Sequence, residues 1–169
     1  MSGKISLPTI TEGIFMKIRK ITENKKQFMQ LLLDADPDEK MIDRYLERGC
    51  MYVLYENEQA IAECVVTEET PQIAEIKNIA VRPDMQGYGY GRKLIDFIAD
   101  TYRKKYSVLQ VGTGDSPVTT LFYEKCGFVF SHILPGFFTD NYDEPIWDGG
   151  VLLKDMVVYR RILREDMND

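Results

Sequence analysis

The chain has 169 residues and a mass of 19.6 kDa, which predicts a single domain because domains mostly contain ~100–200 residues. Hydrophobic residues make up 44% and charged residues 28% of the chain, and no apolar run approaches the ~18 residues of a membrane span, so disordered and membrane proteins are excluded. The net charge of −6 and the pI of about 4.9 argue against nucleic acid as a partner, because sequence-independent phosphate binding needs a basic surface.

The cysteines do not form a recognisable metal-binding or disulfide pattern. Cys50, Cys64 and Cys126 are odd in number and widely spaced, and His132 is the only histidine. Structural zinc sites need four Cys or His ligands, usually in closely spaced pairs. We therefore predict a reduced, cytoplasmic protein without a metal site.

The chain begins with a segment that we place outside the fold. Residues 1–15 lack the basic start and the apolar core of a secretion signal, and we interpret them as a leader, with an extra strand or a cloning remnant as alternatives. Met16–Thr22 alternates apolar and charged residues and predicts a strand. Phe28, Leu31 and Leu32 then recur at helical spacing and predict a helix.

A segment with three aspartates, 34–39, ends this helix and begins a second one. Gly49 ends the second helix, and its apolar face consists of Met41, Ile42, Tyr45 and Leu46. The alternating aspartates are similar to a calcium loop, but that loop needs Gly at its sixth and Glu at its twelfth position. Because Glu39 and Tyr45 stand there, we exclude calcium binding.

The middle of the chain predicts three strands and a long helix. Met51–Tyr55 and Gln59–Thr67 are joined by a short polar turn, which favours an antiparallel hairpin. A third strand, Ile73–Val81, leads into a glycine-rich turn over residues 86–91. The helix that follows has an apolar face made of Leu94, Ile95, Phe97, Ile98 and Tyr102.

The last third continues the alternation of strands and helices. Ser107–Val111 predicts a strand, Ser116–Lys125 a helix, and Phe128–Ile133 and Leu153–Ile162 two further strands. This order indicates a mixed α/β fold without internal repeats.

The glycine-rich turn, Gln86-Gly87-Tyr88-Gly89-Tyr90-Gly91, has the composition of a phosphate-binding loop. A strand that feeds such a turn and then a helix presents backbone N–H groups at the helix N-terminus, where an anion is favoured. The spacing matches neither a P-loop nor the dinucleotide-binding fingerprint, in which the third glycine comes one residue later. Taken alone, the glycines could also form a merely flexible loop.

Two motifs carry a resemblance to a known family. Residues 78–94 closely resemble the acetyl-CoA signature of the GNAT N-acetyltransferase superfamily, whose core matches Gln86, Gly89 and Gly91. Residues 121–128 resemble the second signature, in which a helix tyrosine, here Tyr123, precedes a Gly-Phe pair that enters the next strand.

The resemblance covers Met16 to about Leu163. It implies an α/β (α+β) fold with a central, mixed, mostly antiparallel twisted sheet of roughly six or seven strands, flanked by about four helices and splayed at the acetyl-CoA site. We accordingly expect one acetyltransferase domain over 16–163 and a tail over 164–169. Residues 137–156 are similar to a bacterial subgroup whose acceptor is not established.

The resemblance also implies the residues that bind acetyl-CoA, the cosubstrate. The backbone of Ile79, Ala80 and Val81 would hold the pantetheine arm, a role compatible with core packing of their side chains. The backbone N–H groups of the loop would cradle the pyrophosphate, and the binding residues of this loop are Gln86, Gly87, Tyr88, Gly89, Tyr90, Gly91 and Arg92. Ser116 stands where many relatives carry an asparagine that contacts CoA, but it could equally cap the following helix.

Catalysis would require a general acid and a way to deprotonate the amine. Tyr123 matches the family's general-acid tyrosine, and a phenol can donate a proton to a departing thiolate. The alternative is that Tyr123 is only an aromatic residue packed in the core. Some relatives carry a glutamate base at the position of Val111. Glu75 is the best substitute here and would act through water, with Asp115 second and direct proton loss to water as a further alternative.

Charge is distributed unevenly along the chain. Residues 49–76 contain six glutamates and residues 126–153 contain four acidic residues, and neither stretch contains Lys or Arg. Residues 77–105 carry seven cations against three aspartates. We expect the basic part to bind the anionic CoA and the acidic parts to attract a cationic amine, unless these carboxylates are simply solvated.

The acceptor side is expected to be built from the first helical pair and the last two strands, as the resemblance implies. Its aromatic residues are Tyr45, Phe137, Phe138, Tyr142 and Trp147, accompanied by the acids of 140–148. We predict a small primary amine, polyamine-like or aminoglycoside-like, as the acceptor, ahead of a protein N-terminus or lysine. A sensor module that binds acyl-CoA without efficient transfer is the alternative from another class.

Other partners and roles are also bounded by the sequence. We expect no nucleic acid or membrane partner, and a monomer or homodimer, since the exposed aromatics could instead form a dimer contact. Cys126 is expected to pack behind its helix rather than to act as a reactive thiol.

Overall fold

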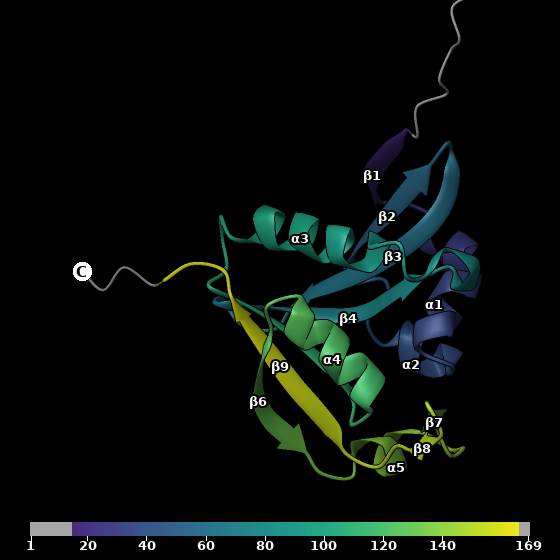
Figure 1. Cartoon of the computed structure of the whole chain (residues 1–169), viewed down its shortest axis with the longest axis vertical. Helices are drawn as coiled ribbons and strands as arrows, with labels where there is room; N and C mark the ends of the chain where they lie inside the picture. The colour runs from purple at the N-terminus through teal and green to yellow at the C-terminus, as the bar shows by residue number, and fades with distance from the viewer. Residues whose placement is uncertain (1–14, 166–169) are drawn as a thin grey trace, which may run out of the picture.

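A computed structural model describes residues 15–165 and contains a seven-stranded sheet (Figure 1). Neighbouring strands are antiparallel, except for the parallel pair β4 and β5. This confirms the predicted mixed, mostly antiparallel sheet. In spatial order the strands are β1 (Met16–Ile21), β2 (Cys50–Glu56), β3 (Gln59–Glu68), β4 (Ile73–Val81), β5 (Val108–Gly114), β9 (Met156–Ile162) and β6 (Val129–Leu134).

Five α-helices and two short 3-10 helices accompany this sheet in the described part of the chain. They are α1 (Met29–Ala35), α2 (Glu39–Asp43), α3 (Tyr90–Tyr102), α4 (Pro117–Lys125) and α5 (Phe137–Asn141), with η1 (Lys25–Phe28) and η2 (Pro83–Met85). The sequence did not predict α5 or the small pair β7 (Trp147–Asp148) and β8 (Val151–Leu152). The predicted last strand begins three residues later, at Met156.

The helices cover the two faces of the sheet and form two cores. On one face α3 and α4 pack against the sheet through Leu94, Ile95, Ile98 and Tyr123, together with Leu109 of β5. On the other face α1 and α2 pack with a smaller cluster, made of Leu32, Ile42, Tyr45, Leu46, Met51, Val53 and Val65. We call this second side, which α1 and α2 cover, the acceptor face.

The strands β4 and β5 diverge halfway along their length. They pair from Ile73 opposite Val108 to Ile76 opposite Val111, and no further. At this point β4 bulges against β3: Val66 opposes Ile76 and Val65 opposes Asn78, so Lys77 has no opposite residue. Since a bulge bends its strand and increases its twist, it turns the second half of β4 away from β5.

A buried lysine fixes the segment that follows α2. Lys25 is 8% exposed, and its Nζ donates hydrogen bonds to the carbonyl oxygens of Leu46 at 2.9 Å, Glu47 at 3.2 Å and Gly49 at 2.7 Å. These carbonyls follow a helical turn and would otherwise be unsatisfied. Lys25 therefore orients the turn that carries Tyr45.

The predicted leader over 1–15 lies outside the described residues except for Phe15, and the same holds for residues 166–169 of the predicted tail. Arg164, at the start of that tail, donates hydrogen bonds to the carbonyl oxygens of Lys104 and Lys105.

Within residues 15–165 we find no helix that combines the length and apolar character needed to cross a membrane.

Candidate active site

The divergence of β4 and β5 exposes strand backbone inside the sheet. Ile79, Ala80 and Val81 lie in the part of β4 that does not pair with β5. Their side chains alternate between the two faces, and the residues are paired only with β3. The second edge of β4 is thus available to hydrogen-bond an amide-containing ligand such as a pantetheine arm.

The glycine loop that follows β4 has the backbone geometry of an anion cradle. Gly87 and Gly89 have φ of +83° and +85°, and no atom of the described chain lies within 4 Å of where their Cβ would be. Gly89 precedes α3, so the N–H groups of the first helical residues have no acceptor inside the helix. A pyrophosphate group fits this arrangement by charge and by hydrogen-bonding capacity.

Several side chains of the loop have structural roles, so the backbone N–H groups remain available to bind a ligand. The Tyr90 hydroxyl donates a hydrogen bond to Glu56, and Tyr88 is 72% exposed. The Gln86 amide donates to the carbonyl oxygen of Val81 at 3.1 Å and so ties the loop to the end of β4. A Cβ on Gly91 would lie 3.0 Å from the ring of Phe122, so glycine allows α4 to pack closely against the start of α3.

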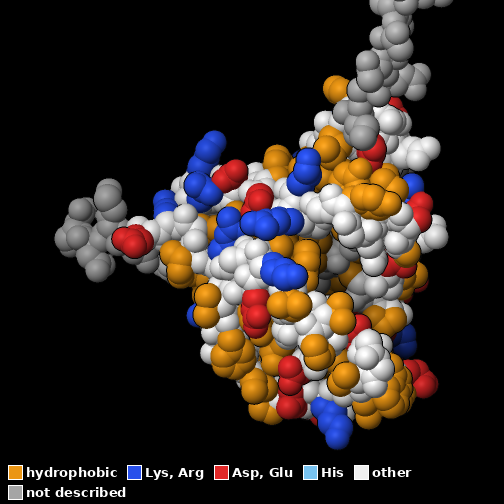
Figure 2. All heavy atoms as spheres, in the orientation of Figure 1, with side chains coloured by type: hydrophobic (Ala, Val, Ile, Leu, Met, Phe, Trp, Pro, Cys, Tyr) orange, Lys and Arg blue, Asp and Glu red, His pale blue; other side chains and the backbone are white. Residues whose placement is uncertain are grey.

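Positive charge gathers beside this loop. Figure 2 shows Lys and Arg side chains over α3 on the face in view. Arg92 and Lys93 lie in the first turn of this helix, beside the loop, whereas Arg103, Lys104 and Lys105 follow its other end. The two cations beside the N–H cradle favour a polyanionic ligand despite the acidic net charge of the whole chain.

Ser116 precedes α4 and has an unused hydroxyl. The residue is fully buried, its side chain makes no capping hydrogen bond, and its Oγ has no partner among the described residues. Pro117 occupies the first turn of the helix. Because the hydroxyl does not cap the helix, it is free to contact a ligand at the open end of β5.

Tyr123 lies on α4 with its ring between two phenylalanines. Its ring centroid is 5.2 Å from that of Phe122 and 5.8 Å from that of Phe128, and the residue is 7% exposed. Its hydroxyl has no hydrogen-bond partner among residues 15–165. Burial, followed by the charges of Cys64, Cys126 and Glu63, raises the pKa of Tyr123. The phenol is therefore protonated at neutral pH.

Glu75, the sequence-predicted base, lies in the part of β4 that still pairs with β5, opposite Gln110. Its carboxylate is 2.7 Å from the Nζ of Lys77, which also lies 3.4 Å from Glu69. The structure thus separates Glu75 along β4 from Ile79, Ala80 and Val81. Asp115, the second candidate, is exposed beside Ser116.

The acceptor side of the gap is covered by the segment that leads into β9. A Cβ on Gly114 would overlap the side chain of Leu153, and one on Gly112 would overlap that of Met156. The two glycines share one face of β5, because strand residues two apart point the same way. Glycine at both positions lets this segment close over the end of β5.

The aromatic residues predicted for the acceptor side come together through Asp36. The hydroxyl groups of Tyr142 and Tyr45 donate to its two carboxylate oxygens, at 3.0 Å and 3.2 Å. Phe138 packs on Tyr142 with ring centroids 5.6 Å apart. Burial raises the pKa of Asp36 and also those of both tyrosines.

A groove opens next to this cluster, between the α1–α2 connection and the segment before β7. We call it the acidic groove, since four carboxylates and one lysine lie among its residues; Trp147, also in it, is 65% exposed. Its lining consists of Pro37, Asp38, Glu39, Lys40, Tyr142, Asp143, Glu144, Pro145, Ile146 and Trp147. Aromatic and carboxylate side chains together suit a cationic ligand.

Sequence reasoning missed two polar residues at this site. Glu63 and Asn78 are buried on β3 and β4 and carry oxygens with no hydrogen-bond partner in the described chain. Glu63 belongs to the acidic stretch over 49–76, yet the residue is fully buried and adds nothing to the surface charge. The sequence did contain a sign of this role: Glu63 is a single charged residue inside an otherwise apolar strand, and buried charges are rare in proteins unless they are paired.

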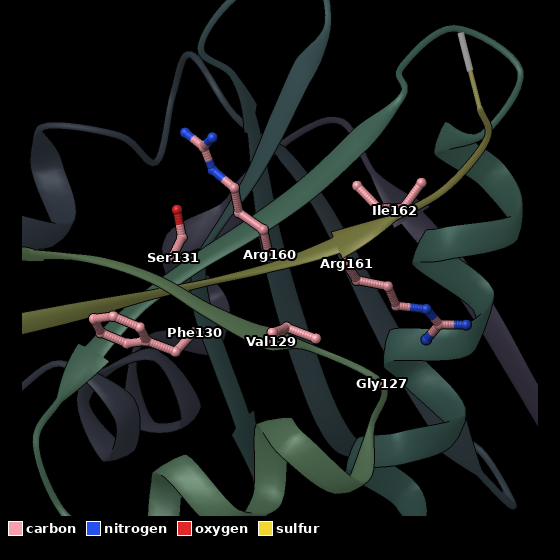
Figure 3. A pocket seen from close by; sticks show the side chains of 7 residues that line it. All are labelled: Gly127, Val129, Phe130, Ser131, Arg160, Arg161 and Ile162. Atoms are coloured by element: carbon pink, nitrogen blue, oxygen red, sulfur yellow. The ribbon is translucent and has the colours of Figure 1, made fainter.

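A second depression lies elsewhere on the molecule. It is lined by Gly127, Val129, Phe130, Ser131, Arg160, Arg161 and Ile162 of β6, β9 and the turn before β6 (Figure 3). The β9 part of this lining pairs with the start of β5, the end away from the divergence, so it is separate from the candidate site.

Cys126 packs in the core as predicted, and residues 15–165 contain no group of three metal-ligating side chains.

The fold and the site define a class of protein. A parallel strand pair that opens beside an N–H cradle, a basic patch and a buried phenol is suited to hold an acyl-CoA and to transfer its acyl group. Residues 47–130 match the family model described as an acetyltransferase (GNAT) domain.

Comparison with individual proteins supports the same family. The chain is 35% identical over 144 residues to the uncharacterized N-acetyltransferase YvbK of Bacillus subtilis, covering 84% of this chain and 93% of that protein. It is 36% identical, with a TM-score of 0.82, to a GNAT family acetyltransferase from Elizabethkingia anophelis with acetyl-CoA bound, over 87% and 97% of the two chains. An IAA acetyltransferase from Bacillus cereus is 36% identical with a TM-score of 0.80, over 88% and 99%.

The chain therefore belongs to the GNAT family of acetyltransferases. It is an N-acetyltransferase that uses acetyl-CoA, as the sequence motifs predicted.

Proposed function

We propose that this enzyme transfers the acetyl group of acetyl-CoA to a primary amine of a small cationic molecule, with Tyr123 as the general acid. The observation that carries the proposal is the Tyr123 hydroxyl, which is held protonated and has no hydrogen-bond partner in the described chain. A phenol in this condition can give its proton to the departing CoA sulfur.

Several residues would hold acetyl-CoA, which supplies an activated thioester. The unpaired edge of Ile79, Ala80 and Val81 would bind the pantetheine amides, and the Ser116 hydroxyl would contact the same arm. The N–H groups of the loop and of the start of α3 would bind the pyrophosphate. Residues used in this way are Gln86, Gly87, Tyr88, Gly89, Tyr90, Gly91 and Arg92.

The acidic groove supports a small cationic acceptor. Its four carboxylates and single lysine give it a negative charge, and Tyr142 and Trp147 offer aromatic faces. Proton removal from the acceptor is assigned to Glu75, acting through water. Glu75 lies on the strand that leads into the gap, and Lys77 holds its carboxylate at 2.7 Å.

Release of the free CoA thiol tests the proposal. The enzyme is incubated with acetyl-CoA and a panel of amines that contains polyamines, aminoglycosides, peptides with free N-termini and peptides with lysine. We expect turnover with small cationic amines, and a loss of roughly 10²- to 10⁴-fold in kcat for Tyr123→Phe with nearly unchanged acetyl-CoA affinity, the range of general-acid catalysis.

Other results would contradict specific parts of the proposal. Turnover restricted to peptides would reject the small acceptor, and normal turnover of Tyr123→Phe would remove the general acid. Tight acetyl-CoA binding with slow thiol release under every acceptor would instead indicate a sensor module. Phe122→Leu, which alters a neighbouring ring without touching a hydroxyl, is the matched control for packing around Tyr123.

A further inference from the structure

Three oxygen atoms on the acceptor face of the sheet lack hydrogen-bond partners within residues 15–165. They are both carboxyl oxygens of Glu63 and the Oδ1 of Asn78. Glu63 is fully buried, and Asn78 is 3% exposed. Buried polar atoms are nearly always paired in folded proteins, so three such atoms require an explanation.

Strand register brings the two side chains to the same place. Glu63 opposes Ala80 and Asn78 opposes Val65 across β3 and β4. Residues that are opposite or two apart share one face of a sheet, so Glu63 and Asn78 are diagonal neighbours within reach of each other's side chains. The Nδ2 of Asn78 donates to the carbonyl oxygen of Leu32 at 3.0 Å and to the hydroxyl of Tyr45 at 2.9 Å.

Nothing else in the described chain neutralises Glu63. No Lys or Arg forms an ion pair with it in residues 15–165, and only the backbone N–H of Ala80 favours its charged form, too weakly to offset burial. An unpaired buried carboxylate is costly. In the ionised form of Glu63 both carboxyl oxygens, like the Oδ1 of Asn78, are acceptors, so a ligand that stabilises this form must bring hydrogen-bond donors and positive charge.

A primary ammonium group meets these requirements. It carries three N–H donors and one positive charge, matching three acceptor oxygens of which two belong to a carboxylate. We propose that Glu63 and Asn78 form the binding site for the primary ammonium of the acceptor substrate. This inference rests on the proposed transfer to an amine and names the residues that recognise it.

The polar network of the acceptor side leads to this site. Tyr142 of the acidic groove contacts Asp36, Asp36 contacts Tyr45, and Tyr45 contacts Asn78, at 3.0, 3.2 and 2.9 Å. The carboxyl of Glu63 is enclosed in this conformation, so binding of the ammonium requires a neighbouring side chain to move. Glu63 lies opposite Ala80, in the part of β4 that does not pair with β5, so the ammonium site borders the gap, whereas Tyr123 packs on the opposite face of the sheet.

Nuclear magnetic resonance of the Glu63 carboxyl carbon tests the inference. The CoA complex of the full chain is labelled with ¹³C at glutamate carboxyl groups, and the Glu63 signal is assigned by its absence in Glu63→Gln. The probe is butylammonium chloride, with butan-1-ol and tetramethylammonium chloride as controls at equal ionic strength. Tyr45 and Asp36 lie on the same face as Glu63, and Cys64 and Tyr123 lie on the opposite face of the sheet; the titration of all four groups must be followed.

We expect butylammonium to shift the Glu63 signal saturably and to move its titration midpoint to lower pH. Butan-1-ol and tetramethylammonium, which lack the charge or the donors, should not do so. Calorimetry should show at least tenfold weaker butylammonium binding for Glu63→Gln. Glu47→Gln, at an exposed glutamate without an ion pair in the described chain, should bind like the wild type.

The inference would be overturned if the Glu63 signal did not change on addition of butylammonium, or if it changed equally with all three probes. Acetyl transfer to amines without a Glu63 response would overturn the ammonium site alone and leave the proposed function standing. A Glu63 response without acetyl transfer to any amine would support the ammonium site and contradict the proposed function.

Discussion

Replacing Glu63 by glutamine should change how the stability of the protein depends on pH. Burial raises the pKa of this carboxyl well above its ordinary value, whereas in the unfolded chain it titrates near ~4.3. Between these two values the folded state binds more protons than the unfolded state. The free energy of unfolding of the wild type therefore falls as the pH rises through this window, and the contribution of Glu63 is fully favourable only below it.

The size of this change in unfolding free energy can be calculated, because the folded and unfolded states differ by one bound proton at Glu63. A single group that is protonated in the folded state and ionised in the unfolded state lowers stability by ~1.4 kcal/mol per pH unit. For a domain of this size that corresponds to roughly 3–6 °C in Tm per pH unit, at about 2–4 °C per kcal/mol. Glutamine does not titrate, so the Glu63→Gln variant lacks this slope whatever the fixed cost of burying its amide.

Urea unfolding at half-unit steps from pH 5 to pH 7 measures the difference. The free energy of unfolding of the variant minus that of the wild type should increase steadily as the pH rises, until the raised pKa of the folded state is reached. Contributions from Asp36 and the other buried groups are common to both proteins, and Glu47→Gln controls for loss of a surface charge. Parallel curves for variant and wild type across this range would refute the reasoning.

Three further changes test other parts of the structure. Lys25→Met should lower the free energy of unfolding by roughly 3 kcal/mol, because three carbonyl oxygens lose a charged donor; urea unfolding measures this, and a loss no greater than that of exposed Lys20→Met would contradict it. Gly89→Ala should cost about 1–2 kcal/mol of stability through its φ of +85° alone and should weaken acetyl-CoA binding in calorimetry, whereas unaltered affinity would remove this residue from the cradle. Glu75→Gln should lower kcat, measured by release of the CoA thiol; a normal kcat would exclude Glu75 as the base.

Much of the fold could be predicted from the sequence because local patterns there are strong. The hairpin of β2 and β3 and the apolar face of α3 follow from periodicity and turn residues alone. The parallel pairing of β4 with β5 and the opening of the gap came from resemblance to a family. Neither α5 nor the β7–β8 pair was predicted, since elements of five and two residues carry too little periodicity.

The candidate site was harder to predict because it depends on register and on contacts between distant residues. Glu63 sits in an apolar strand, and only the pairing with β4 and the packing of Tyr45 reveal that its carboxyl lacks a partner. Tyr142 and Asp36 are 106 positions apart in sequence and meet only in the fold. Whether the Ser116 hydroxyl caps α4 was likewise undecided in the sequence, and the structure shows that it makes no capping hydrogen bond.

The place of β9 in the sheet has a consequence for the order in which the protein can assemble during synthesis. This late strand lies between β5 and β6, and β6 pairs with no other strand of the described sheet. While the ribosome is still adding residues before Met156, β6 and the outer edge of β5 have no partner, and exposed Val129 and Phe130 lie on an unpaired edge. The same final segment brings Leu153 and Met156 over Gly114 and Gly112. The acceptor side of the site is thus completed only when the sheet itself closes, so chains truncated before β9 should be both aggregation-prone and inactive.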